Sequence, residues 1–195
     1  LDLRLFKQKA FSLGVSASFF TFLGSSAVLF LTPFYLQNVL GKSPTEAGLI
    51  VVPAALCIAV TGPFSGRLSD RYGWRMFTVG GLTIAIAGLL LLSTMDERSP
   101  VGLVIVALVL QSIGVGIFFS PNASSILSAV ERSRYGIVLA VNHLTRNSAQ
   151  VAGVAVATTI VVATMGSEGA GSTLEAVVSN PEGFVTGLHR LYMAM

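Results

Sequence analysis

Five apolar runs, each long enough to cross a lipid bilayer, constrain this chain more than any other feature of its sequence. A transmembrane helix needs roughly 20 mostly apolar residues. The runs lie at about 11–36, 47–66, 76–95, 101–125 and 136–164. Hydrocarbon offers backbone N–H and C=O groups no partner outside their own segment, so each run is predicted to be a helix. The sequence therefore predicts an all-α, multi-pass membrane protein with five transmembrane helices.

Composition agrees with that fold and argues against a soluble domain. Apolar residues make up 53% of the chain and charged residues 11%, whereas soluble domains carry roughly a quarter charged residues. The net charge of +3 resides in the short loops, so it indicates membrane topology and not nucleic-acid binding. The single cysteine, Cys57, and the two histidines predict no internal disulfide and no metal site. We expect no cofactor.

Basic residues gather in alternate loops and set the predicted orientation. One side carries Arg4, Lys7, Lys9, Arg67, Arg71, Arg75, Arg132 and Arg134, and the other carries Lys42, Arg98 and Arg190. Lys and Arg favour the cytoplasmic side of a membrane. We therefore predict a multi-pass protein of the cell (inner) membrane with its N-terminus in the cytoplasm and its C-terminal tail outside.

The last part of the chain, 165–195, is predicted to be an external loop followed by the start of a further span. Residues after Gly166 are rich in Gly, Ser and Glu, and the final GFVTGLHRLYMAM is apolar again. This end could be a short interfacial helix or the first turns of a truncated sixth span. We favour the second, because a bare apolar segment is an unusual end for a chain. The absence of an initial Met likewise suggests a piece of a longer protein.

The stretch GPFSGRLSDRYGWR, from Gly62 to Arg75, concentrates charge between the second and third runs. We expect a tight cytoplasmic turn, in which Gly66 and Gly73 let two helices bend and approach closely. Asp70 can favour the positive end of a helix, and the arginines can meet lipid headgroups or pair with Asp70. An ordinary basic loop explains the arginines but not two Gly and one Asp at this spacing.

This pattern resembles the signature loop of the major facilitator superfamily, G-x-L-a-D-r-x-G-r-r. The matching positions are Gly66, Leu68, Asp70, Arg71, Gly73 and Arg75, with Ser69 in place of the usual small residue. In that family the loop joins spans 2 and 3 of a six-helix half. The resemblance implies that Gly66, Asp70, Arg71, Gly73 and Arg75 form a latch at the cytoplasmic ends of the two halves.

The rest of the chain resembles the C-terminal half of the fourteen-span drug:proton antiporters of this superfamily. The similar stretches are LDLRLFKQKAFS, LTPFYLQNVLGKSPTEAGLIVVPAA, GVGIFFSPNAS and NHLTRNSAQVAGVAVA. The resemblance implies spans 9 to 13, three-plus-three inverted repeats, and a substrate site near the midplane between two halves. It also implies a missing N-terminal half, a small-molecule substrate and protons as the coupling ion.

The fifth run carries a polar stripe that should not face lipid. Asn142, His143, Arg146, Asn147 and Gln150 fall within about 140° on a helical wheel. Burying an arginine at membrane depth costs at least about 2.5 kcal/mol on insertion scales. The stripe is therefore predicted either to line a cavity that contacts substrate or to join helices near the inner end of the span.

Other residues of the runs favour structural roles. Ala149, Gly153 and Ala157 recur every four residues, which predicts close helix packing. Gln111 is expected to serve packing more than substrate contact, and His143 to be a structural donor. Asn122-Ala-Ser is a glycosylation sequon by letters only, and we expect no glycan because it lies at the cytoplasmic end.

The nine acidic residues all lie outside the predicted spans. A proton-coupled antiporter normally needs a carboxylate at membrane depth, so this residue would belong to the missing half. We predict a secondary transporter, most simply a proton-driven drug exporter. The alternatives are a metabolite transporter of the same fold, or a non-transporting membrane fragment with an assembly or regulatory role. We expect no enzyme, because the sequence holds neither H-E-x-x-H nor G-x-S-x-G.

Overall fold

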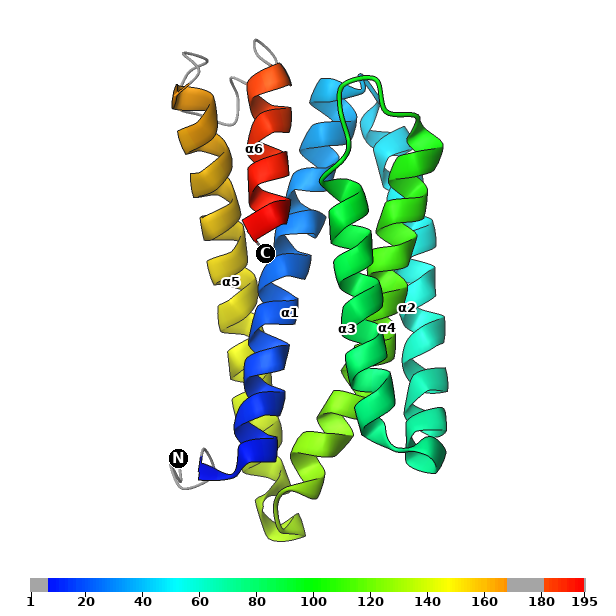
Figure 1. The fold of residues 1–195 in the computed structure, drawn as a ribbon, viewed down its shortest axis with the longest axis vertical. Coiled ribbons are helices and arrows are strands. Elements are labelled where there is room, and N and C mark those ends of the chain that lie inside the picture. The colour runs from blue at the N-terminus through cyan, green and yellow to red at the C-terminus, as the bar shows by residue number, and fades with distance from the viewer. Residues whose placement is uncertain (1–6, 168–180, 195) are drawn as a thin grey trace.

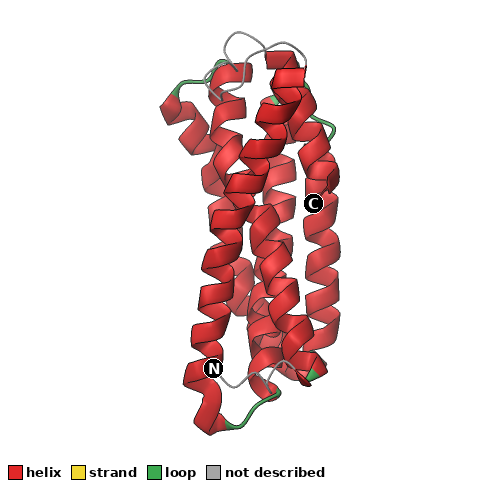
Figure 2. Ribbon diagram, turned by 90° about the vertical axis from the view of Figure 1, so that its left-hand side faces the viewer, coloured by secondary structure: helices red, strands yellow, loops and turns green. Residues whose placement is uncertain are grey.

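The computed structural model describes residues 7–167 and 181–194, and this part of the chain is almost entirely helical. Five of its helices are long and apolar enough to cross a membrane. The elements, in chain order, are α1 (Lys9–Phe34), the π-helix η2 (Tyr35–Val39), α2 (Pro44–Tyr72), α3 (Trp74–Leu92), α4 (Val101–Ser128), the 3-10 helix η3 (Arg132–Arg134), α5 (Tyr135–Ser167) and α6 (Pro181–Ala194). Figures 1 and 2 show them as one upright bundle.

The helices form two groups. In the first, α2 and α3 both pack along α4; in the second, α5 packs along α1 and α6 packs on α5. The groups meet mainly where α1 contacts α4 (Figure 1). The groups therefore do not follow the order of the chain, because α1 packs with α5 and α6 and not with α2 and α3, which follow it in sequence.

The turn between α1 and α2 is defined by local sequence signals. Pro33 lies in the last turn of α1, and the chain continues as a π-helix through Val39. Gly41 takes a φ of 64°, a left-handed conformation that glycine adopts without a steric cost. Ser43 then caps α2: its backbone N–H donates to Glu46 Oε2 at 2.9 Å while its hydroxyl accepts from the Glu46 N–H at 3.3 Å. This reciprocal pair is a capping box.

The segment predicted to be a turn from Gly66 to Arg75 is mostly helix. Residues 66–72 continue α2 and Trp74 begins α3, so Gly73 alone separates the two helices, with a φ of 92°. Gly66 lies within α2, and a Cβ there would collide with the Ser120 hydroxyl of α4. Asp70 lies in the last turn of α2 and not at the start of a helix, which corrects the expectation made from its charge.

Glycines allow α3 and α4 to touch through their backbones. A Cβ on Gly81 would lie 2.7 Å from the Phe118 backbone nitrogen and 2.8 Å from the Gly114 carbonyl oxygen. A Cβ on Gly88 or Gly114 would collide with the backbone of the opposite helix. Small residues of this kind let membrane helices gain van der Waals contact where no hydrophobic driving force exists between them. The predicted packing face of α5 behaves similarly: Ala149 and Ala157 are fully buried, and Gly153 lies against Leu23 of α1.

Helix α6 lies beside α5 within the bundle and does not lie flat across its end (Figure 1). Phe184, Leu188 and Leu191 are buried in the largest apolar cluster. His189 hydrogen-bonds the Met95 carbonyl, and Tyr35 donates to the Asp96 carbonyl at 2.6 Å. These bonds attach the loop between α3 and α4 to the other helix group. The middle of the predicted external loop, 168–180, and Arg4 lie outside the described residues.

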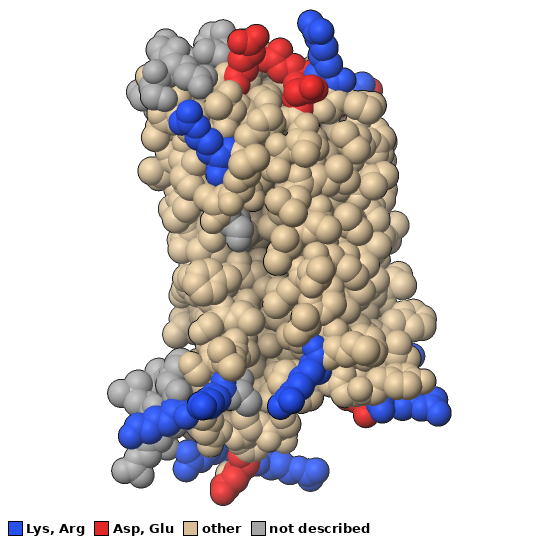
Figure 3. Space-filling model, viewed as in Figure 1, with Lys and Arg blue, Asp and Glu red and all other residues tan. Residues whose placement is uncertain are grey.

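The charged residues visible in Figure 3 lie at the two ends of the bundle. Lys and Arg gather mainly at the end where α1 begins, acids gather mainly at the opposite end, and an uncharged belt lies between them (Figures 1 and 3). Helix α2 is longer than the predicted span, so Glu46 and Asp70 fall in its first and last turns. The belt between the charged ends is the part of the surface suited to lipid.

The packing of α3 against α4 is tested by two neighbouring glycines. Gly81→Ala places a methyl group against the Phe118 backbone, and we expect it to destabilise the protein by about 1–3 kcal/mol through overpacking. Gly80→Ala is the matched control, because nothing lies within 4 Å of a Cβ at Gly80. Thermal unfolding of the detergent-purified protein measures both. Equal melting temperatures for the two variants would contradict the packing described here.

Candidate functional site

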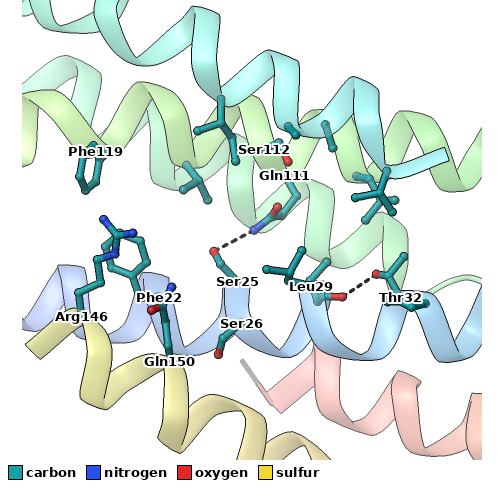
Figure 4. Close-up of a pocket in the computed structure, with 18 residues that line it drawn as sticks. Phe22, Ser25, Ser26, Leu29, Thr32, Gln111, Ser112, Phe119, Arg146 and Gln150 are labelled. Atoms are coloured by element: carbon teal, nitrogen blue, oxygen red, sulfur yellow. Dashed lines mark hydrogen bonds between the residues drawn. The ribbon is translucent and has the colours of Figure 1, made fainter. Parts of the chain in front are cut away.

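A cavity of about 420 Å³ lies between α1, α2, α4 and α5. Most of its wall is aliphatic, from residues such as Leu29, Val51 and Leu108. Residues Phe22, Ser25, Ser26, Leu29 and Thr32 all belong to one face of α1, at helical spacing. The cavity follows the line along which the two helix groups meet, and Figure 4 shows its polar side chains.

A hydrogen bond across the two groups forms part of the cavity wall. Gln111 of α4 is buried, and its Nε2 donates to Ser25 Oγ of α1 at 3.0 Å (Figure 4). Further along α4, Asn122 Nδ2 donates to two groups of α1, the Gly14 carbonyl at 3.0 Å and Ser18 Oγ at 2.8 Å. We call these three bonds the α1–α4 seam. Gln111 was expected to serve packing; it does so and also lines the cavity.

Burial of Asn122 bears on the sequon that begins there. The side chain is 3% exposed and both of its bonds reach α1. A glycan on this nitrogen would have to displace α1, so the buried position is incompatible with glycosylation in this fold.

Arg146 of α5 contacts two aromatic rings in the wall of the cavity. Its guanidinium carbon lies 4.9 Å from the centre of the Phe22 ring on α1 and 5.7 Å from that of Phe119 on α4. The two rings are themselves edge to face, 5.9 Å apart. We call these three residues the Arg146 clamp (Figure 4). Each cation–π contact is worth about 0.5–2 kcal/mol, so the clamp offsets much of the cost of an arginine at this depth.

The predicted polar stripe of α5 is divided by the structure. Arg146 and Gln150 line the cavity. Asn142 is half-buried and its Oδ1 is enclosed without a hydrogen-bond partner among the described residues. His143 and Asn147 are exposed and do not line this cavity. A stripe about 140° wide covers more of a helix surface than one cavity wall occupies, so only its central part faces inward.

Sequence reasoning did not identify the cavity residues of α1 and α4. Phe22 and Phe119 read as ordinary apolar residues within long apolar runs, and nothing in the sequence pairs them with Arg146. Ser25 and Ser26 carry a weak signal, because two adjacent hydroxyls interrupt the first apolar run. Intramembrane polar residues usually face a bundle interior or a cavity, and both serines line this one.

Comparison with known families decides the relationship of the chain. The family model described as the Major Facilitator Superfamily matches residues 14–170. The chain belongs to the major facilitator superfamily. This confirms the resemblance that was inferred from the signature segment and from the four similar stretches.

Several curated bacterial proteins are similar to this chain. The riboflavin transporter RibZ of Clostridioides difficile is 34% identical over 136 residues, which cover 70% of this chain and 30% of that protein. The lincomycin resistance protein LmrB of Listeria monocytogenes is 29% identical over 84% of this chain and 35% of its own length. The multidrug resistance protein Stp of Mycobacterium tuberculosis is 31% identical over 84% of this chain and 30% of its own length. The chain therefore matches about a third of each of these relatives.

The signature segment of the superfamily is exposed at the end of the bundle. Asp70, Arg71 and Arg75 are exposed, and no ion pair joins them to one another in the described part of the chain. The arginines instead lie over their neighbours' rings, Arg71 at 5.9 Å from the centre of Tyr72 and Arg75 at 5.4 Å from that of Trp74. Of the two alternatives given for the arginines, pairing with Asp70 is therefore absent within this segment. All three charged side chains remain available to pair with another segment.

The seam is tested by a double-mutant cycle on Gln111→Leu and Ser25→Ala. We expect a coupling of about 0.6 kcal/mol and at most about 1.7 kcal/mol, the range measured for interhelical hydrogen bonds in membrane proteins. Unfolding of the purified protein by denaturant gives the four free energies. The matched cycle pairs Gln150→Leu with Ser25→Ala, since Gln150 lines the same cavity without bonding Ser25. Additive effects in the first cycle would show that the bond contributes nothing.

Proposed function

We propose that this chain forms the larger part of the C-terminal half of a proton-coupled transporter that exports drug-like compounds. The observation that carries the proposal is the cavity, which joins aliphatic walls to a few polar groups along the line between two helix groups. Ligand sites of this composition are the usual sites for amphipathic small molecules. Membership of the superfamily, and similarity to the resistance proteins LmrB and Stp, support export of such compounds.

In this proposal, the remaining half of the transporter packs against the cavity side of the chain, and substrate binds between the halves. Alternating access then proceeds by rocking of one half against the other around the site. Arg146 and Gln150 contact the substrate, whereas Asn142, His143 and Asn147 serve the contact with other segments or with lipid. No Asp or Glu belongs to the described cavity wall, so the proton-carrying carboxylate is assigned to the other half.

The signature residues Gly66, Asp70, Arg71, Gly73 and Arg75 are proposed to latch the cytoplasmic ends of the halves in one conformation. The exposed charges described above support this role, because they are free to pair across the interface between halves. Gly66 brings α2 close to α4 and Gly73 makes the turn. The latch therefore moves with the α2–α3–α4 group and not as a loose loop.

A second candidate function is transport of a metabolite. The observation in its favour is the similarity to RibZ, a riboflavin transporter. The same cavity and the same rocking mechanism would serve it. A membrane fragment with a purely regulatory role predicts, by contrast, that no compound in a substrate panel is moved.

Export is tested with the transporter expressed from its full coding sequence in a bacterial strain that lacks its main exporters. Inverted vesicles that hold a proton gradient should accumulate compounds from a panel of drugs and riboflavin. An uncoupler should abolish this accumulation. Asp70→Asn should lower the rate at least about fivefold through loss of the latch. Glu131→Gln, an exposed acid at the same end, should retain it. Accumulation that persists without the gradient would contradict proton coupling.

The orientation is tested by single cysteines in a Cys57→Ser background. Ser133→Cys lies between α4 and α5 on the side that we propose to be cytoplasmic, and Lys42→Cys lies between η2 and α2 on the opposite side. A membrane-impermeant maleimide added to intact cells should label Lys42→Cys and should label Ser133→Cys only after the cells are opened. The reverse pattern would overturn the proposed cytoplasmic N-terminus.

A further inference from the structure

Arg146 is the single charged residue in the described wall of the cavity. Its guanidinium makes no hydrogen bond or ion pair with any other described residue, and its Nε is enclosed without a partner. An arginine cannot lose its charge in a protein. A buried N–H of a charged group that stays unpaired is costly, so the cavity presents a fixed cation that is still short of hydrogen-bond acceptors.

The clamp does not supply the hydrogen-bond acceptors that the guanidinium lacks. The centres of the Phe22 and Phe119 rings lie 4.9 and 5.7 Å from its central carbon. These rings carry no oxygen or nitrogen acceptor, whereas the five N–H donors of an arginine form a planar fork. That fork matches the two oxygens of a carboxylate. The aromatic contacts therefore hold Arg146 without satisfying its donors.

The remainder of the wall defines the other part of the ligand. Leu29, Val51, Ala55, Ile58 and Leu108 are apolar, and Gln111 already donates to Ser25. A low-dielectric wall strengthens an ion pair formed within it. A cationic compound would meet Arg146 without any described acid to offset the repulsion.

We infer that Arg146 binds the carboxylate of the transported compound, so that the substrates include amphipathic organic anions with an apolar body. The inference rests on the proposed function, because it assigns a substrate class to the same cavity. Arg146 then acts as a specificity residue: the clamp holds its guanidinium at the cavity, and the apolar wall receives the apolar body of the ligand. A neutral analogue of the same shape keeps the apolar contacts and loses the charged pair.

The test compares binding of 2-naphthoate with that of 2-naphthamide, its neutral analogue, to the intact purified transporter by isothermal titration calorimetry. We expect 2-naphthoate to bind at least about tenfold more tightly, since hydrogen bonds to charged groups are the stronger kind. Arg146→Gln should bring the two affinities within about twofold of each other while keeping 2-naphthamide binding. Arg98→Gln, an exposed arginine of the α3–α4 loop, should keep the wild-type preference.

Each outcome decides the inference. Equal affinities in the wild type overturn it. A preference that survives Arg146→Gln also overturns it. Should Arg146→Gln bind neither probe, Arg146→Lys decides: a preference reduced severalfold supports the bidentate pair, and an unchanged preference overturns it.

Failure of the inference is distinguishable from failure of the proposed function. Export of both probes at equal rates would leave the exporter proposal standing and remove the anion preference. A charge preference in binding, with neither probe exported, would keep the site at Arg146 and remove the transport role.

Discussion

The arrangement of this protein depends on the seam between α1 and α4, where the two helix groups meet. Within each group the helices contact one another extensively, and α3 and α4 touch through their backbones. The seam is narrower, and amide side chains of α4 reach hydroxyl and carbonyl oxygens of α1 there. Such bonds are individually weak in membranes, at about 0.6 kcal/mol on average. One of the three bonds of the seam, from Gln111 to Ser25, borders the cavity.

The grouping of the helices follows the symmetry of the superfamily. In the proposed function the chain belongs to a six-helix half, and such a half contains two inverted three-helix repeats. The two sets are α1 to α3 and α4 to α6. The first helix of each set packs with the other set: α1 packs with α5, and α4 packs with α2 and α3. The two exchanged helices are also the two that form the seam. The cavity therefore takes its walls from both repeats, and no single repeat could form it.

The sequence predicted the membrane-spanning helices well because that prediction rests on a strong constraint. Lipid leaves the backbone of a long apolar run no alternative to a helix. The ends of the runs were harder, since charge alone does not end a helix. Residues from Gly66 to Tyr72 stay helical because nothing in them requires a different backbone, whereas Gly73 adopts a positive φ. Small residues at four-residue spacing on α5 were correctly predicted to pack closely, since Gly153 meets α1.

The candidate site was predicted only in part. A polar stripe on one helix is visible in a sequence, and Arg146 and Gln150 were found in this way. Which edge of the stripe faces inward depends on helices far away in the chain, so the exposure of His143 and Asn147 could not be read from the stripe. Phe22 and Phe119 acquire their role only through the fold, because each belongs to a different helix from Arg146.

The Arg146 clamp draws one residue from each of α5, α1 and α4, and so from both helix groups. Phe22 moves with the group that contains Arg146, but Phe119 belongs to the other. If one group slides along the other, Phe119 therefore moves away from the guanidinium while Phe22 stays beside it. The electrostatic environment of Arg146 thus depends on the relative position of the two groups. A change in that environment, in turn, shifts the preferred position of the groups.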